Sequence, residues 1–379
     1  MGSYGARRYA FIDAVRGMAA CLVLLQHSLE NSGLEEIMPG MFGLSWLNLG
    51  ESGVLAFFIV SGFVIPLSLE KWNSVRHFVI NRIFRIYPLY IVIYLCTLSI
   101  VGLSSFHSGN EIFLSAAAHL FFLQQYFNIT DLVNNSWTLS LEAVWYISFS
   151  LLFVLSFNRK NHLILTFCLI ATFVVCSFSL GNLVRVPLGR FGLLLACVMG
   201  LIFFRSERDE ISRRASFATL AAVLAMIGAC LFVGFLLRPG TALTTPSFRC
   251  VELSWLLGFG LFLVPFLSRD WSGWRGPGLR YLGTVSYSIY LIHPPLMLIL
   301  NQLPVSGAAY LAIVLPATLA LASLTYRYVE RPAITWAHNL LLSPARIEDR
   351  AQAIRLAVGA QVAPEPAPNY PLFPGEAPQ

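Results

Sequence analysis

Residues 7–30 read RRYAFIDAVRGMAACLVLLQHSLE, an apolar stretch of helical length that follows two arginines and contains three further ionisable side chains before its last residue. A bilayer core about 30 Å thick needs about 20 mostly apolar residues in a helix, so this stretch is long enough to cross a membrane. It carries Asp13 and Arg16 and has no small-residue cleavage site, which favours a retained first helix over a signal peptide. Similar stretches recur along the chain, and together they predict the fold class.

The composition is typical of a polytopic helical membrane protein. Hydrophobic residues make up 57% of the 379 residues and charged residues only 12%, against roughly 25% charged in soluble domains. Apolar runs near the length of a membrane span alternate with short charged stretches. We expect an all-α protein with about ten spanning helices, at roughly 9–29, 51–70, 82–102, 138–157, 162–180, 188–204, 216–236, 250–268, 281–300 and 306–326.

The positions of lysine and arginine predict the orientation. If the shorter and more polar segment 112–127 does not cross, 21 of the 25 basic residues lie on the side of the N-terminus, and if it crosses the split is 11 against 14. Cytoplasmic loops are enriched in these residues. We therefore expect both termini in the cytoplasm, a location in the cell inner membrane, and a re-entrant or interfacial helix at 112–127. The net charge of +6 then calls for no nucleic-acid partner.

Two parts of the chain differ in composition. Residues 1–335 hold the apolar runs and form the expected integral-membrane domain. Residues 336–379 begin with a modest amphipathic stretch and end in APEPAPNYPLFPGEAPQ, which is too rich in proline to fold alone. We expect a cytoplasmic tail that is disordered from about residue 360.

Ionisable side chains inside apolar stretches are the first functional candidates, because a bilayer makes them costly. Arg16 and His27 are 11 residues apart, which is three helical turns plus about 20°, so they share a face about 16 Å apart along the axis. Asp13 can pair with Arg16 three positions later. Arg16 can equally be a snorkelling anchor, and His27 is either a satisfied core histidine or a general base for an alcohol.

The third span starts with HFVINRIFRIYPLY, which places Arg82 and Arg85 on one face. Two guanidinium groups at this spacing near a helix N-terminus suit a phosphate group. Basic residues at this position also follow from topology alone, and R-x-x-R is a weak motif.

Two later segments carry further polar residues. In NNSWTLSLEAVWY, Glu142 needs a partner inside the membrane and can orient a histidine or bind a sugar hydroxyl. In YSIYLIHPPLM, two prolines follow His293 and are expected to kink the helix and free backbone carbonyls. A structural kink and a functional role are both open for His293.

Several enzyme classes are excluded because their motifs are absent from the sequence. The chain has no G-x-x-x-x-G-K-[ST], no G-x-S-x-G, no H-E-x-x-H, and no H-x-x-x-x-D of the soluble glycerolipid acyltransferases. Its seven cysteines show no C-x-x-C spacing, so we expect neither a disulfide framework nor a metal site.

In order along the chain, these segments resemble the acyltransferase 3 family of integral-membrane O-acyltransferases, which modify bacterial surface carbohydrates and some secreted small molecules. The resemblance covers about residues 8–332 and rests on six fragments. They are IDAVRG with the R-x10-H pair Arg16 and His27, GVLAFFIVSGFVI, FVINRIFRIYPLY, SWTLSLE, YSIYLIHPP and YRYVERP.

The resemblance implies roles for the candidate residues. Arg82 and Arg85 would hold the phosphates of cytoplasmic acyl-CoA, with acetyl-CoA as the expected co-substrate, and Arg16 would line its path. His27 would be the catalytic base or a transient acyl carrier, and Glu142 would orient His27 or the acceptor. No permanently bound cofactor is implied. The residues implied to support the site are Asp13, Trp137, Ser140, Tyr146 and His293.

The chain departs from the family pattern in two places. Many members have a second carboxylate after the motif glutamate, where this chain has Ala143, and this affects acceptor handling. Many members also carry a C-terminal esterase-like periplasmic domain, where this chain is expected to have a short cytoplasmic tail. For a member of this form, the resemblance implies direct transfer or a separate periplasmic partner. A homo-oligomer is also compatible with the sequence.

We therefore expect an O-acyltransferase that moves an acyl group from acyl-CoA to a hydroxyl of a glycan or lipid-linked saccharide at the bilayer. One alternative is an O-acyltransferase of a secreted small molecule. The others are a non-catalytic transporter of acyl groups or polysaccharide precursors and a non-catalytic subunit of polysaccharide export.

Overall fold

The computed structural model describes residues 9–34, 46–102, 109–127, 129–181, 187–237 and 247–341, and the expected tail lies almost entirely outside them. The chain forms two units, residues 1–334 and residues 335–379. The described residues contain helices and no strand. The helices are α2 (Ala10–Ser32), α4 (Leu49–Trp72), α5 (Val75–Val101), α6 (Gly109–Leu120), α7 (Ser136–Val154), α8 (Asn161–Leu180), α9 (Leu188–Glu207), α10 (Arg213–Leu231), η2 (Phe232–Leu237), α11 (Phe248–Leu267), η3 (Ser272–Arg275), α12 (Pro277–Leu300), α13 (Gly307–Thr325), η4 (Tyr326–Glu330) and α14 (Arg331–Leu341).

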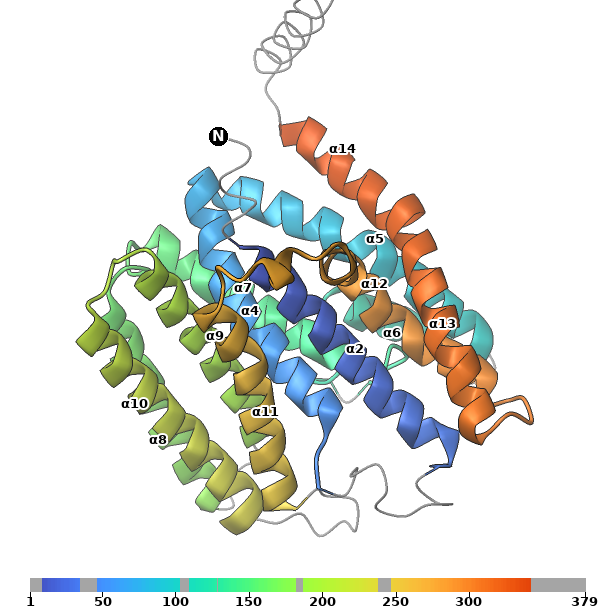
Figure 1. Cartoon of the computed structure of the whole chain (residues 1–379), viewed down its shortest axis with the longest axis horizontal. Helices are drawn as coiled ribbons and strands as arrows, with labels where there is room; N and C mark the ends of the chain where they lie inside the picture. The colour runs from blue at the N-terminus through green and yellow to red at the C-terminus, as the bar shows by residue number, and fades with distance from the viewer. Residues whose placement is uncertain are drawn as a thin grey trace, which may run out of the picture. The chain divides into compact units, whose positions relative to one another are not determined.

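Ten helices of the described chain are long and apolar enough to cross a membrane, which confirms the expected number (Figure 1). One predicted boundary is wrong. The span predicted at 82–102 begins at Val75, because Ser74 caps the helix by accepting a hydrogen bond from the backbone N–H of His77. Arg82 and Arg85 therefore lie two to three turns inside α5, away from the free N–H groups at its start.

The central helix is α4, which packs against α2, α9 and α11 through glycines. A Cβ atom at Gly62 would lie 1.9 Å from the carbonyl oxygen of Cys197, and one at Gly200 would lie 2.0 Å from that of Ile59. Small residues let helix backbones approach this closely, which gives dispersion contacts where lipid supplies no hydrophobic drive between helices. The α4–α9 contact therefore depends on the missing side chains.

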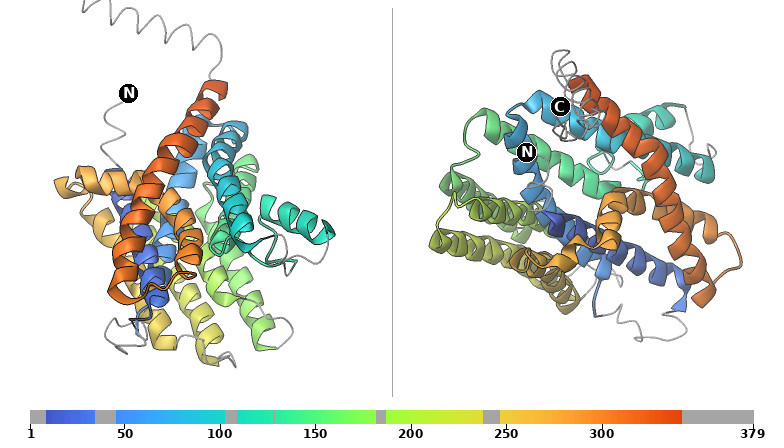
Figure 2. Two further views of the ribbon diagram at one scale, coloured as in Figure 1. Left: turned by 90° about the vertical axis from the view of Figure 1, so that its right-hand side faces the viewer. Right: turned by 45° about the horizontal axis from the view of Figure 1, so that its top comes forward.

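Two hydrogen bonds give the direction of α7 relative to α4. Glu142 in α7 accepts a hydrogen bond from Ser61 in the middle of α4, and Asn158 after α7 donates to Glu70 near the end of α4. Thus α4 and α7 run in the same direction, and α5 ends where α7 begins. The 12-residue helix α6 is about 18 Å long, too short to cross. In the left view of Figure 2 it lies across the long helices beside α5, so the segment 112–127 does not cross.

The two ends of the helix bundle differ in their polar residues. We call the end at which α4 and α7 begin the histidine end, because His27 and His293 lie towards it. The other end, at which α5 and α12 begin, carries most of the arginines, and we call it the arginine end. That the arginine end faces the cytoplasm is a prediction from the count of basic residues.

A buried ion network joins three elements at the arginine end. Arg205 at the end of α9 is 1% exposed and lies 2.6 Å from Glu70 of α4 and 2.5 Å from Glu210. It also donates to the backbone carbonyl of Asn158 after α7. Removing one partner of a buried pair costs about 3–5 kcal/mol, because the other charge is left unpaired. Arg205, counted in the sequence only towards topology, therefore also fixes α4 and α9 at this end.

The outer helices present apolar side chains. Phe167, Ile170 and Phe173 of α8 are between 58% and 73% exposed. Their exposure fits a helix that faces lipid, and it leaves the polar residues of the protein to the central helices.

The close approach of α4 and α9 gives a matched pair of substitutions. Gly62→Ala should destabilise the protein by about 1–3 kcal/mol, because the added methyl group meets the backbone of α9. Gly228→Ala in α10 adds the same group where no atom lies within 4 Å, and it should leave stability unchanged or raise it. Thermal unfolding in detergent micelles measures both. Equal midpoints for the two variants would contradict the tight crossing.

Candidate active site

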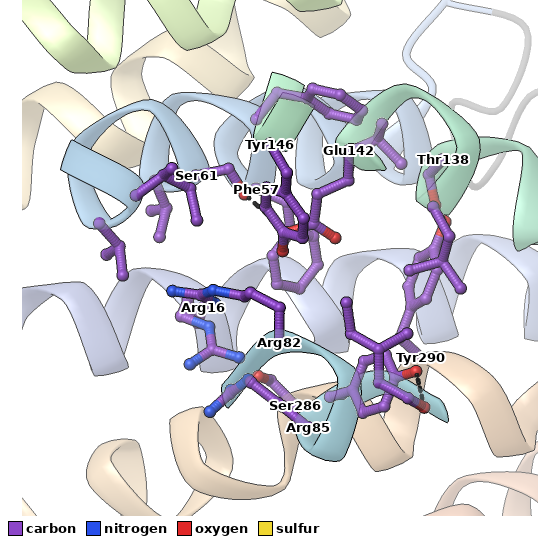
Figure 3. Close-up of a pocket in the computed structure, with 18 residues that line it drawn as sticks. Arg16, Phe57, Ser61, Arg82, Arg85, Thr138, Glu142, Tyr146, Ser286 and Tyr290 are labelled. Carbon is purple, nitrogen blue, oxygen red and sulfur yellow. Dashed lines mark hydrogen bonds between the residues drawn. The ribbon is translucent and has the colours of Figure 1, made fainter. Parts of the chain in front are cut away.

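A cavity with a volume of about 190 Å³ lies between α2, α4, α5, α7 and α12. Arg16 of α2 and Arg82 and Arg85 of α5 line one side of it, and Glu142 and Tyr146 of α7 line the other (Figure 3). We call this space the arginine cavity. It brings together five of the residues that the sequence singled out.

The arginine cavity has an excess of positive charge. Within the described residues, none of its three arginines forms an ion pair within 4.0 Å. The guanidinium of Arg82 is held by the rings of Phe78 and Tyr146, at 5.3 and 5.4 Å, and its buried Nε atom has no hydrogen-bond partner. Glu142 instead accepts hydrogen bonds from Ser61 and from the hydroxyl of Tyr146. Three unpaired guanidinium groups around one space suit a ligand with several negative charges.

Asp13 differs from the sequence prediction. It was expected to pair with Arg16, but no ion pair joins the two side chains in the described part of the chain. Arg16 lines the cavity beside the arginines of α5, and its guanidinium is thereby left available to a ligand.

A second pocket of about 100 Å³ lies at the histidine end. His27 of α2 and His293 of α12 line it with their rings stacked, 5.4 Å between centroids and 15° between planes. We call it the histidine pocket. Four asparagine side chains share its lining: Asn31, Asn134, Asn135 and Asn301.

His27 is oriented by a carboxylate that the sequence analysis did not single out. Its Nδ1 atom lies 2.9 Å from Glu30, so a neutral His27 donates Nδ1–H to the carboxylate and keeps a lone pair on Nε2. Gln26 holds Glu30 in turn, at 2.7 Å, and accepts a hydrogen bond from the backbone of Leu49 in α4. Glu142, for which orientation of His27 or of the acceptor is expected, lies in the arginine cavity and makes its hydrogen bonds to Ser61 and Tyr146, so of these two roles only the one towards the acceptor stays a prediction. The H-x-x-E spacing of His27 and Glu30 was the signal in the sequence from which this contact could have been predicted.

His293 has both ring nitrogens engaged. Its Nδ1 lies 3.0 Å from the carbonyl oxygen of Ile289, which can only accept, so Nδ1 carries the proton. Its Nε2 then accepts from the side-chain amide of Asn135 at 3.1 Å. With no free lone pair or proton, His293 supports the ring of His27 by stacking and is not placed to exchange a proton with a ligand.

A proline creates the link between α7 and α12. Pro294 has no N–H, so the carbonyl of Tyr290 four residues earlier has no helical donor. The side chain of Asn135 donates to that carbonyl at 3.2 Å, which explains why Asn135 makes no cap hydrogen bond at the start of α7. The hydroxyls of Tyr290 and Thr138 also lie 2.9 Å apart. The expected freeing of a carbonyl near His293 is thus observed, together with its partner.

The residues Asn135, Thr138 and Tyr290 separate the two spaces, and we call them the partition. Tyr290 and Thr138 line the arginine cavity, and Asn135 lines the histidine pocket. The helices α2 and α12 contribute residues to both spaces, whereas α7 lines the arginine cavity and the two asparagines directly before it line the histidine pocket. The arginine cavity and the histidine pocket therefore follow one another along α2 and α12, with the partition between them.

Besides Asp13, two further predicted supporting residues line neither space. Ser140 is buried and donates to the backbone carbonyl of Phe122, which ties α7 to the segment after α6. Trp137 packs under the guanidinium of Arg190 at 5.3 Å. Both hold the segments at the histidine end in place.

Comparisons with known proteins place these features in context. The model of an acyltransferase domain family matches residues 9–327. The chain is 27% identical to a protein of Komagataeibacter xylinus named as the membrane-bound transacylase BcsY, over 91% of this chain and 87% of that protein. It is 22% identical to nodulation protein 10 of Rhizobium leguminosarum bv. viciae (85% and 92%). It is 24% identical to the peptidoglycan O-acetyltransferase OatA of Listeria monocytogenes, where it spans 87% of this chain but 56% of OatA. No solved structure matches.

The partition gives a second matched pair. Asn135→Ala should cost about 1–3 kcal/mol of stability, because it leaves the carbonyl of Tyr290 and Nε2 of His293 without a donor. Asn134→Ala should have little effect on stability, because the exposed Asn134 makes no hydrogen bond within the described chain. Unfolding midpoints in micelles test this, and a neutral Asn135→Ala variant would contradict the proposed link.

Proposed function

This chain belongs to the acyltransferase family whose domain it matches, and on that premise we propose that it transfers an acyl group, acetyl above all, from cytoplasmic acyl-CoA to a hydroxyl of a glycan or lipid-linked saccharide. The observation that carries this proposal is that the arginine cavity and the histidine pocket follow one another along α2 and α12. A donor with its phosphates at one end and its thioester at the other fits such an arrangement.

The donor is proposed to enter from the arginine end. Arg16, Arg82 and Arg85 would bind the phosphates of CoA, because all three guanidinium groups face one space without a carboxylate partner in the described chain. Apolar side chains, among them Phe57 and Leu139, line the same cavity on the way to Tyr290 and suit the pantetheine arm. The distance from Arg16 to His27 along α2 is about 16 Å, so a long flexible arm is needed to join the two sites.

The proposed chemistry takes place at His27. Its Nε2 removes the proton of an acceptor hydroxyl while the hydroxyl oxygen attacks the thioester carbonyl. The carbon–sulfur bond then breaks, an ester remains on the acceptor, and the proton passes from His27 to the departing thiolate, which leaves as CoA thiol. Glu30 stabilises the imidazolium that forms between these steps, because its carboxylate lies 2.9 Å from Nδ1.

The proposed location follows from the two ends. If the arginine end faces the cytoplasm, the histidine pocket opens on the outer side of an inner-membrane protein, where surface glycans are found. A secreted small molecule as the acceptor would use the same pocket. A homo-oligomer or a separate periplasmic partner protein stays a prediction, and the proposed reaction involves no nucleic acid.

The catalytic proposal is tested with purified protein in nanodiscs, acetyl-CoA and isolated cell-envelope glycan. His27→Ala should lower acetyl transfer by about 10²–10⁴-fold, the contribution of a general base. Glu30→Gln should lower it by about 10–100-fold, as expected for a residue that orients a catalytic histidine. Glu252→Gln, on the exposed face of α11, is the matched control and should be neutral. Thiol release that persists unchanged in His27→Ala would refute the role of His27.

The donor proposal is tested with a donor that lacks phosphates. Arg82→Ala and Arg85→Ala should each weaken binding of acetyl-CoA by about 10–100-fold, the effect of one charge-assisted hydrogen bond. Neither should change the KM for S-acetyl-N-acetylcysteamine, which has the thioester without the nucleotide. Arg76→Ala in the first turn of the same helix is exposed and should not alter either value. Equal losses with both donors would instead indicate a distorted cavity.

A further inference from the structure

The four asparagines of the histidine pocket have no role in the reaction proposed above. Asn31 comes from α2, Asn134 and Asn135 from the turn before α7, and Asn301 from the cap of α12. Together with the two histidines they give this small pocket six side chains that can form hydrogen bonds and carry no fixed charge.

Two of these amides have atoms left for a ligand. The amide of Asn301 donates to Asn31 at 2.8 Å, and its carbonyl oxygen has no partner in the described chain. Asn134 makes no hydrogen bond there at all. Both residues are exposed at the pocket, whereas Asn135 is buried and uses its amide within the partition. Asn134 and Asn301 are therefore the free recognition groups of the pocket.

The lining as a whole suits a hydroxylated ring. An amide offers both donors and acceptors, as does a hydroxyl group, so an amide can pair with neighbouring hydroxyls in either sense. The remaining lining comes from Pro294, Met297 and Leu298, which present apolar surface to the C–H face of a ring.

The charge of the pocket excludes another class of ligand. No lysine or arginine is among the described residues that line it. The nearest carboxylate, Glu30, contacts His27. A carboxylate or phosphate group that entered would lose hydration without gaining a cation and would approach a like charge. This is the reverse of the arginine cavity, which has three cationic groups.

Resting on the proposed function, we infer that the histidine pocket takes an uncharged, hydroxyl-rich acceptor group, with Asn134 and Asn301 as specificity-determining contacts, and excludes acceptor groups that carry a carboxylate or phosphate. The acceptor hydroxyl then lies beside Nε2 of His27, the lone pair that the contact with Glu30 leaves open.

The test compares two acceptors of equal length and linkage, cellotetraose and β-1,4-tetraglucuronate, in which a carboxylate replaces the hydroxymethyl group of each ring. Wild-type protein in nanodiscs with acetyl-CoA should transfer acetyl groups to cellotetraose about tenfold faster or more. Asn134→Ala and Asn301→Ala should each raise the KM for cellotetraose by about 5–30-fold, the effect of one lost hydrogen bond. Asn110→Ala, exposed in α6, should not change it.

A reversal of charge makes the test independent of lost stability. Asn134→Arg adds a cation at the pocket and should raise transfer to β-1,4-tetraglucuronate relative to cellotetraose. Equal transfer to both acceptors by the wild type, no transfer to cellotetraose, or unchanged KM values in both alanine variants would overturn the inference. Release of CoA thiol that does not depend on His27 would overturn the proposed function instead, so the two failures are distinguishable.

Discussion

A hydrocarbon layer offers no hydrogen-bond partner, so each polar group that a spanning helix carries must be matched inside the protein or face a cavity. The structure meets this constraint in two ways. Arg205 is enclosed with Glu70, and the carbonyl that Pro294 leaves open is taken by Asn135. The arginines of α2 and α5 are the contrast, because they are unmatched in the described chain and line a cavity. These unmatched charges are the reason why we propose that the arginine cavity binds an anionic donor.

The two spaces have opposite chemistry although α2 and α12 line both of them. The arginine cavity has a surplus of cations, and the histidine pocket has amides and imidazoles without a cation in its described lining. Both α2 and α12 therefore change their lining chemistry along their length. Under the proposed reaction, this gradient keeps a polyanionic donor at one end and a neutral acceptor at the other.

The sequence predicted the spans, because hydropathy is a property of each helix alone, whereas the place of Arg16 on the donor path with the arginines of α5 was implied by the resemblance to the acyltransferase family. The sequence did not predict that Arg16 and His27 lie in different spaces, since a shared face does not show what packs between two residues. The resemblance implied that Glu142 orients His27 or the acceptor, whereas Glu30, one turn from His27, is the carboxylate that contacts this histidine. The role of Asn135 depends on how α7 packs against α12, and contacts between helices are not encoded in the pattern of either one alone.

The partition also bears on the electrical work that is needed to move a chemical group across the membrane. A tyrosine and a threonine hydroxyl, 2.9 Å apart, lie where two polar spaces from opposite ends of the bundle meet. An elementary charge that crosses a membrane exchanges about 2.3 kcal/mol with each 100 mV of potential. An acetyl group is uncharged, so under the proposed reaction it passes this point without electrical work while the phosphates stay behind. Under the proposed reaction, the partition is therefore the point that only the uncharged end of the donor has to reach.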